Sequence, residues 1–478
     1  MDTGSFEFLL FGFAAVILSN LGRSAAWRSA VLLLASVAFL VLASPHLITL
    51  LPLAGFLLLG YACLVLIERS WLKSTVWSVL AVLFAYAWLK KYTFLPQATF
   101  LGFPYVTLGL SYIFFRILHL LIETGDGAGK RSIGPVAYLL YTLNFTTLVS
   151  GPIQRYDDFA RDQFASEPIP LGPRTVGAQL ERIVRGFFKV NVLAMLLHAT
   201  QEDALAQLSQ SVSLWPRLFA GFRLAAVYPF FLYSNFSGYI DIVVALARLM
   251  RVRLPENFDR PFSACSFIEF WNRWHITLSS WLKTYVYNPL LLALMRRVSS
   301  PAMGPMLGVV CFFVTFFLVG IWHGRTSEFV LFGVLQGGGV AINKLWQLGL
   351  TRRLGRKGYN KLAKNAFYSA FGRGLTFSWF AFTLFWFWAS WRQIHEVFTA
   401  LGPLQWLGVW LALYFFATLV LAAWELLRSA LLSISTAEGP VLRSSYALVV
   451  YASALGFIAF IVTVLLSQPA PDIVYKAF

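Results

Sequence analysis

The sequence predicts an all-α, polytopic membrane protein, and this prediction rests on composition, hydropathy and the spacing of apolar runs. Of the 478 residues, 58% are hydrophobic and 12% are charged, and the mean hydropathy is +0.69. Soluble domains carry about 25% charged residues, so a chain this poor in charge is expected to lie in a bilayer. We expect about eleven transmembrane helices, together with re-entrant or interfacial helices.

Runs of apolar residues that can span or nearly span a bilayer follow one another along the chain. They lie at roughly residues 6–22, 28–44, 47–67, 74–89, 100–121, 135–152, 183–200, 214–234, 236–250, 302–323, 327–349, 374–391, 403–424 and 444–467. Some are short enough to be tilted or re-entrant, so we expect fewer spans than runs. The sequence shows no fixed-period repeat, and we expect one polytopic domain over residues 1–478.

The net charge of +17 is expected to serve membrane topology rather than nucleic-acid binding. The composition leaves no soluble domain to bind nucleic acid, whereas basic loops gather on the cytoplasmic side of membrane proteins. The largest basic cluster, residues 351–364, is therefore expected to be cytoplasmic. At the start of the chain, MDTGSFEF is acidic where a cleaved signal peptide is basic, so we expect the first apolar run to be retained.

The three cysteines, Cys63, Cys265 and Cys311, are scattered through apolar runs. Their number and spacing fit neither a metal site nor a disulfide framework, so we expect no bound metal. The chemistry is therefore sought among histidines and charged groups within or beside the apolar segments.

Two polar groups interrupt segments that would otherwise suit lipid. Asp241 is the sole charge between Leu224 and Leu246, and an ionisable group at membrane depth is expected to face a partner or a water-filled cavity. A structural pair with an arginine on another helix and a role in substrate binding are both open for Asp241. Arg155 lies in SGPIQRYDDF, residues 150–159, where a Gly-Pro break ends an apolar run at an interface.

The segment Pro255–Pro289 combines tryptophan, charge and histidine in one stretch. Taken as a helix from about Ser266, it places apolar and aromatic residues at the i, i+3, i+4, i+7 spacing of one face. That face consists of Trp271, Trp274, His275, Leu278 and Leu282. Glu269 and Arg273 are four residues apart and can form an ion pair. Such a helix suits a membrane–water interface, where His275 could be no more than a satisfied interfacial residue.

A second histidine, His323, ends a long apolar run directly after Trp322 and is flanked by Gly320 and Gly324. Glycine lets another helix or a substrate approach closely because it has no Cβ. A lone histidine at the end of a span is usually interfacial, but here His323 and His275 each follow a tryptophan. Histidine takes up a proton readily near neutral pH, so both are candidates for catalysis.

The two motifs, EFWNRWHITLSSWLKTYVYNPL and GIWHGRTSEFVLFGVLQG, resemble those of the membrane-bound O-acyltransferase superfamily. The nearest branch contains alginate O-acetylation and teichoic acid D-alanyl transfer proteins. Supporting matches are SGPIQRYDDF, GFFKVNVLA, YSNFSGYIDI and PENFDRPF, and the resemblance covers about residues 108–345. It implies a ring of tilted transmembrane helices around a central funnel, and transfer of an acyl group from a thioester to a hydroxyl.

The resemblance also implies roles for particular residues. His323 would be the catalytic histidine, a general base for the acceptor hydroxyl, and His275 would be the supporting histidine. The expected substrate-binding residues are Trp322, Trp274, Arg273, Asn272, Asp241 and Arg155. A thioester is already activated, so we expect no bound cofactor and no metal. The acyl donor would be acetyl-CoA or an acyl-carrier thioester.

The expected function is transfer of an acyl group, most simply acetyl, from a cytoplasmic thioester to a hydroxyl of an extracytoplasmic polysaccharide or its partner protein. The protein would then lie in the bacterial cytoplasmic (inner) membrane, in contact with lipid and an extracytoplasmic modification partner. D-alanyl transfer to a cell-envelope polymer and acylation of a lipid or protein hydroxyl are alternative reactions. A polysaccharide-precursor transporter or a structural subunit would explain the spans but would leave the two Trp-His motifs without a role.

Overall fold

The computed structural model describes residues 4–69, 74–127, 132–298, 300–436, 439–440, 445–465, 471–472 and 474. Within these ranges the regular structure is helical apart from one antiparallel pair of two-residue strands, β1 (Ser435–Thr436) and β2 (Gly439–Pro440). The chain divides into two compact units, each assembled from separated stretches of sequence. The first unit holds residues 1–191, 235–256 and 459–478, and the second holds residues 192–234 and 257–458.

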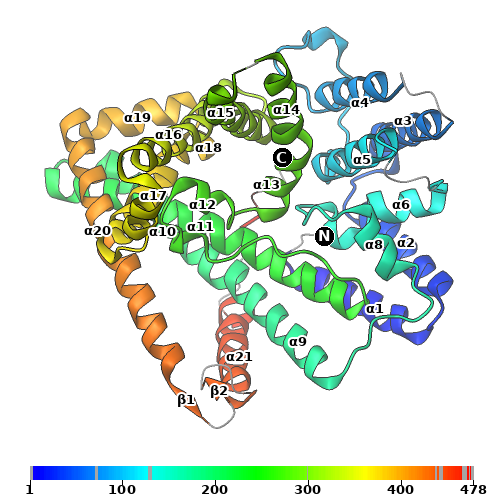
Figure 1. Ribbon diagram of the computed structural model, residues 1–478. Coiled ribbons are helices and arrows are strands. Elements are labelled where there is room, and N and C mark those ends of the chain that lie inside the picture. Colours follow the sequence, from blue (N-terminus) through cyan, green and yellow to red (C-terminus); the bar gives the residue numbers. More distant parts are fainter. Residues whose placement is uncertain are drawn as a thin grey trace. The chain divides into compact units, whose positions relative to one another are not determined.

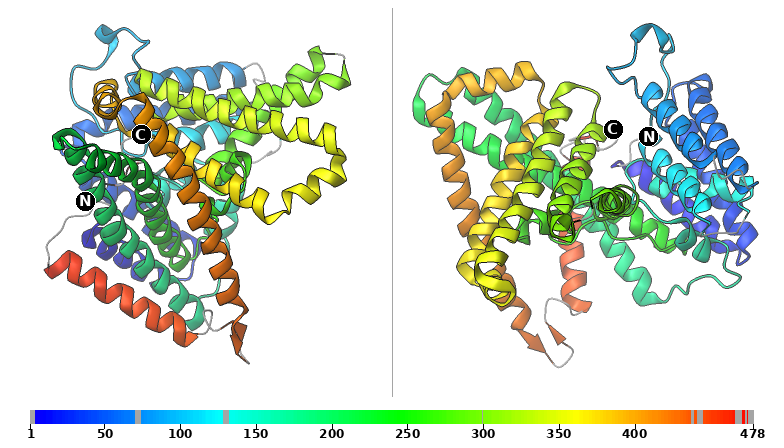
Figure 2. Two further views of the ribbon diagram at one scale, coloured as in Figure 1. Left: turned by 90° about the vertical axis from the view of Figure 1, so that its left-hand side faces the viewer. Right: turned by 45° about the horizontal axis from the view of Figure 1, so that its top comes forward.

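The first unit consists of α1 (Phe6–Leu21), α2 (Ala25–Leu42), η1 (Leu47–Leu50), α3 (Leu51–Glu68), α4 (Ser74–Leu89), η2 (Gln97–Thr99), α5 (Leu110–Gly125), α6 (Pro135–Leu143), α7 (Phe145–Leu148), α8 (Tyr156–Gln163), α9 (Pro173–Phe188) and part of α11 (Leu214–Leu249). Helices α3, α4 and α5 pack against one another and form a blue-to-cyan group (Figures 1 and 2). Gly60 on α3 permits this packing, because a Cβ there would overlap Ile117 on α5.

The second unit consists of α10 (Met195–Gln210), the first part of α11, η4 (Pro261–Ser263), α12 (Phe267–Trp271), α13 (Ile276–Leu282), η5 (Lys283–Tyr287), α14 (Asn288–Arg297), η6 (Pro301–Met303), α15 (Gly304–His323), α16 (Ser327–Ala363), α17 (Ala366–Thr383), α18 (Phe385–Trp388), α19 (Trp391–Leu401), α20 (Pro403–Ser433) and most of α21 (Ser445–Phe460). The π-helical turns η3 (Lys189–Ala194) and η8 (Ile461–Leu465) adjoin α10 and α21. Helices α15 and α16 lie side by side along much of their length (Figures 1 and 2).

Eight of the described helical segments are long and apolar enough to cross a membrane. They are Ala25–Leu42, Leu47–Glu68, Pro173–Gln210, Leu214–Leu249, Gly304–His323, Ser327–Ala363, Pro403–Ser433 and Ala447–Val464. Two shorter apolar helices, Phe6–Leu21 and Thr75–Leu89, accompany them. These helices confirm the predicted all-α, multi-pass membrane protein, whereas the predicted count of about eleven spans and the ring around a funnel stay predictions.

At two places the helices differ from the predicted spans. Residues 214–234 and 236–250, predicted as separate spans, form the single helix α11, which continues through Pro229 and Asn235. The side chain of Asn235 is satisfied away from its own helix, because its Nδ2 donates a hydrogen bond to the carbonyl of Asp472 at 3.1 Å. The run 135–152 is instead broken, since Asn144 leaves the helical conformation and its side chain caps α7 by accepting a hydrogen bond from Thr146 N at 3.1 Å.

Candidate functional site

The segment predicted to be one helix from about Ser266 is broken at His275. Helix α12 ends at Trp271 and α13 begins at Ile276, and His275 between them has φ 45° and ψ 52°. A residue in this left-handed conformation cannot continue a right-handed helix, so the prediction of a single helix was wrong. The predicted face is nevertheless buried in full: Trp271, Trp274, His275, Leu278 and Leu282.

Asn257 holds the break in place. Its backbone carbonyl accepts a hydrogen bond from Ile276 N at 3.0 Å, and its Oδ1 accepts from Thr277 N at 3.1 Å and Thr277 Oγ1 at 2.8 Å. The same Oδ1 lies 3.3 Å from His275 Nδ1. Asn257 therefore caps α13 from a preceding loop and orients the imidazole. Asn257 lies in PENFDRPF, one of the segments that carry the family resemblance, but the sequence alone indicates no role for its side chain.

His275 is fully buried and lies outside the eight helical segments that can cross a membrane. Burial lowers the pKa of its imidazole to about 3, because desolvation disfavours the charged form. A neutral imidazole offers one donor and one acceptor nitrogen. His275 is therefore suited to hydrogen bonding and positioning rather than to carrying a charge.

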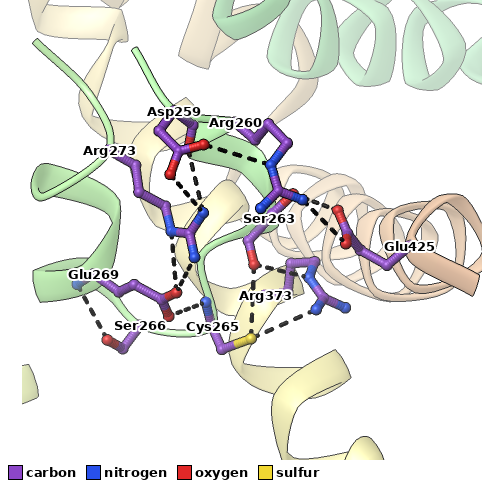
Figure 3. Close-up of polar contacts among 9 residues, drawn as sticks. All are labelled: Asp259, Arg260, Ser263, Cys265, Ser266, Glu269, Arg273, Arg373 and Glu425. Atoms are coloured by element: carbon purple, nitrogen blue, oxygen red, sulfur yellow. Dashed lines mark hydrogen bonds and ion pairs between the residues drawn. The ribbon is translucent and has the colours of Figure 1, made fainter. Parts of the chain in front are cut away.

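Arg273, a predicted substrate-binding residue, takes part in the polar network that Figure 3 shows. It forms the predicted ion pair with Glu269 at 2.9 Å, and its guanidinium also lies 3.5 Å from the carboxylate of Asp259. In the same network, Arg373 on α17 donates a hydrogen bond to the carbonyl of Ser263 at 3.2 Å. The geometry gives Arg273 a structural role, and its contact with a substrate stays a prediction.

Trp274 and Asn272, two further predicted substrate-binding residues, differ in exposure. The Trp274 ring is buried, with ring centroids of Phe258 and Phe380 each 5.1 Å away. Asn272 is exposed and forms the C-cap of α12. Trp274 thus fixes the motif against α17, whereas Asn272 lies at the surface.

His323 is the last residue of α15 and is only 2% exposed. Its ring centroid lies 4.6 Å from Trp322, 5.1 Å from Phe387 and 5.9 Å from Phe332. The Trp322 ring in turn lies 6.3 Å from that of His275. The structure therefore brings the two predicted catalytic histidines to one buried aromatic cluster, with Trp322 contacting both.

Glycines allow α15 and α16 to approach closely below His323. A Cβ on Gly333 would lie 2.5 Å from the carbonyl oxygen of Phe317, and one on Gly337 would lie 2.5 Å from that of Phe313. Gly320 on α15 faces Gly333 directly. The predicted role of glycine in close helix approach is confirmed for Gly320, and this contact sets the position of the end of α15.

Asp241 lies in the first unit at the centre of an ion-pair cluster. Its carboxylate accepts hydrogen bonds from Lys189 Nζ at 2.8 Å and from Arg182 Nε at 2.9 Å, and Arg185 Nε lies 3.5 Å away. Arg182 also forms a bidentate pair with Glu256 at 2.6 and 2.7 Å. These contacts favour the structural alternative for Asp241, because a carboxylate at membrane depth needs such partners.

Arg155 lies in the first unit as well, exposed at the start of α8. Two buried polar groups of α5 also form hydrogen bonds within this unit. His119 accepts a hydrogen bond from Tyr156 N at 3.1 Å, and Arg116 donates to the carbonyl of Thr142 at 2.8 Å. Asp241 and Arg155 therefore belong to one unit, and the histidine cluster with Trp322, Trp274, Arg273 and Asn272 belongs to the other. Within the described ranges, no three histidine, cysteine, aspartate or glutamate side chains are placed to hold a metal ion.

The model of MBOAT, the membrane-bound O-acyltransferase family, matches residues 37–371. The match contains both Trp-His motifs and covers more than half of the chain. The chain belongs to the membrane-bound O-acyltransferase family. This membership confirms the resemblance seen in the sequence.

Relatives of this MBOAT protein carry two kinds of name. A teichoic acid D-alanyltransferase of Streptococcus thermophilus is 32% identical over 284 residues, which cover 57% of this chain and 65% of the relative. One of Bacillus subtilis is 26% identical over 229 residues, covering 48% and 56%. A probable alginate O-acetylase AlgI of Pseudomonas fluorescens is 29% identical over 248 residues, covering 52% and 46%. The matches thus span less than two thirds of the length of each of these relatives.

Proposed function

We propose that this MBOAT protein is an O-acyltransferase that moves an acyl group from a cytoplasmic thioester to a hydroxyl of an extracytoplasmic polysaccharide or its partner protein. Family membership and the names of the relatives support acyl transfer to polymers of the cell envelope. The multi-pass helices suit the bacterial cytoplasmic membrane, where a donor and an acceptor on opposite sides can reach one protein.

The observation that carries this proposal is the buried cluster of His275, Trp322 and His323. A transporter or a structural subunit has no need of two histidines that converge from separate segments. General-base catalysis does need an imidazole in a site closed to water, because competing hydrolysis would otherwise consume the thioester. Both histidines are buried, as such a site demands.

In the proposed reaction, His323 takes the proton of the acceptor hydroxyl while the hydroxyl oxygen attacks the thioester carbonyl. A new C–O ester bond forms, the C–S bond breaks, and the departing thiolate receives a proton, so that the imidazole returns to its neutral form. His275, neutral and oriented by Asn257, positions the reacting groups by hydrogen bonding. No metal or serine nucleophile is required, because the thioester is already activated.

The acyl group is most simply acetyl, delivered from acetyl-CoA. D-alanyl transfer from an acyl-carrier thioester is the second candidate, and the 32% identity to a teichoic acid D-alanyltransferase favours it. The two differ in that a D-alanyl ester carries an ammonium group, which an acetyl ester lacks.

The test is the alkali-labile acyl content of the cell envelope, measured as released acetate and released D-alanine at matched protein levels. Deletion and His323→Ala should both remove the acyl group, since a positioned general base contributes about two to four powers of ten in rate. His395→Ala, at an exposed histidine of α19, is the matched control and should behave as the wild type. An unchanged acyl content after deletion would refute acyl transfer to the envelope, and normal content with His323→Ala would refute the general-base role.

A further inference from the structure

Gln336 on α16 is a fully buried polar side chain to which the proposed reaction gives no role. Its Nε2 donates a hydrogen bond to Thr383 Oγ1 at 2.8 Å, and Thr383 Oγ1 donates to the carbonyl of Phe380 at 2.8 Å. A threonine hydroxyl has one proton, and that proton is used by Phe380, so Gln336 must face Thr383 with its NH₂ group. This chain of hydrogen bonds fixes the orientation of the amide.

The fixed amide leaves its other end unsatisfied. Oε1 of Gln336 is buried, and no donor among the described residues forms a hydrogen bond with it. A buried acceptor without a donor costs about 1–3 kcal/mol, so an apolar residue of the same length would suit this position better if only the fold mattered. The position is therefore one where a donor is expected to arrive from outside the chain.

Gln336 lies one helical turn from the aromatic cluster around His323. Phe332, which contacts the His323 ring, precedes Gln336 by four residues on α16, and buried residues on this face include both. On the opposing segment, Thr383 precedes Phe387 by four residues, and Phe387 contacts both the His323 and Phe332 rings. The Gln336–Thr383 pair thus forms the next layer beneath the His323 cluster.

We propose that Gln336 is a substrate-binding residue, whose Oε1 accepts a hydrogen bond from an O–H or N–H donor of the substrate bound beside His323. This rests on the proposed acyl transfer. His323 and Gln336 are both closed off from solvent, on neighbouring turns of one packed cluster. Two substrate groups have this donor chemistry: the hydroxyl of the acceptor and the ammonium group of an aminoacyl donor.

The decisive variant is Gln336→Met, which keeps the length of the side chain and removes Oε1. Thr383 keeps its hydrogen bond to Phe380, so the thermal midpoint of the purified full-length protein should stay unchanged or rise. The initial rate of envelope acylation after induction should fall about 3- to 10-fold if a neutral group donates the hydrogen bond to Oε1. It should fall more steeply if an ammonium group donates it. Thr383→Val, the companion variant, leaves Oε1 present but orphans the NH₂ group, so it should lower the midpoint while affecting the rate less.

Two probes with the same thiol identify the donor group: acetyl-pantetheine and D-alanyl-pantetheine thioesters, added to the full-length protein while its midpoint is recorded. If Gln336→Met abolishes the stabilisation by the D-alanyl probe alone, the ammonium group of that probe is the group that donates the hydrogen bond to Oε1. If both probes still stabilise the Gln336→Met variant while transfer falls, the group that donates the hydrogen bond to Oε1 is the hydroxyl of the acyl acceptor. Wild-type transfer and unchanged probe effects with Gln336→Met would overturn the inference and leave only a buried water at Oε1. An unchanged acyl content after gene deletion would instead refute the proposed function, and with it this inference.

Discussion

Replacing Gly333 by alanine tests whether close packing of α15 and α16 positions His323. The new Cβ would lie 2.5 Å from the carbonyl oxygen of Phe317, about 0.9 Å short of ordinary contact at 3.4 Å. Because the obstacle is backbone within a helix, no side-chain rotation can relieve the overlap. The two helices must therefore separate by nearly this distance at a point six residues before His323.

The magnitude follows from two effects. Overpacking of this kind costs about 1–3 kcal/mol of folding stability, partly offset by the better helix propensity of alanine, worth about 1 kcal/mol. A displacement of about 1 Å in a catalytic group can lower the rate about 100-fold. We therefore expect a loss of activity on the order of tenfold or more, larger than the loss of stability alone would produce.

Gly338→Ala is the matched control, because it lies on the same helix and its Cβ would meet no atom within 4 Å. The helix-propensity gain is the same in both variants and cancels when they are compared. Thermal unfolding of the purified protein and the rate of envelope acylation would be measured side by side. Equal stability and equal activity of the two variants would show that the glycine contact does not position His323.

Three further results are expected. Asp241→Asn should destabilise the protein by about 3 kcal/mol, since Lys189 and two arginines lose their shared carboxylate; an unchanged thermal midpoint would contradict this. Burial lowers the pKa of His275 from 6.5 to about 3, so between these pH values the imidazole is protonated in the unfolded chain but neutral in the folded protein. The free energy of unfolding should therefore be at its full value above pH 6.5 and fall by about 1.4 kcal/mol per pH unit below it. Midpoints measured from pH 7 to 5 should therefore fall less steeply with His275→Gln, and parallel slopes would count against a neutral His275. Asn257→Ala should cost about 2 kcal/mol, because Thr277 loses two hydrogen bonds to Oδ1, whereas Asn257→Asp keeps the acceptor and should cost less; equal effects would argue against the cap.

Several features could be predicted because they depend on neighbours along the chain. Apolar runs marked the helices, the four-residue spacing gave the Glu269–Arg273 pair, and the i, i+3, i+4 pattern identified the buried face around Trp274. Each depends on local periodicity, which the sequence displays directly. The convergence of His275 and His323 was expected only from the resemblance to a family.

The features that escaped prediction depend on residues distant in sequence. The break at His275 is held by Asn257, eighteen positions earlier, and no local pattern shows that its side chain reaches back to α13. Asp241 finds its cations more than fifty residues upstream, so the sequence could not choose between a structural and a substrate role. The fixed amide of Gln336 likewise depends on Thr383, which lies on another helix.

The buried arginine of α5, Arg116, ties this helix to the break that follows α6. A buried guanidinium that is left without acceptors keeps the full penalty of losing its water. The acceptors of Arg116 include the carbonyls of Tyr141 and Thr142, which are synthesised 25 and 26 residues later and become free where α6 ends at Asn144. These carbonyls take the place of water around the guanidinium of Arg116, which is closed off from solvent. The break after α6 is therefore a requirement of the buried arginine, because a continuous helix there would keep these carbonyls in its own hydrogen bonds.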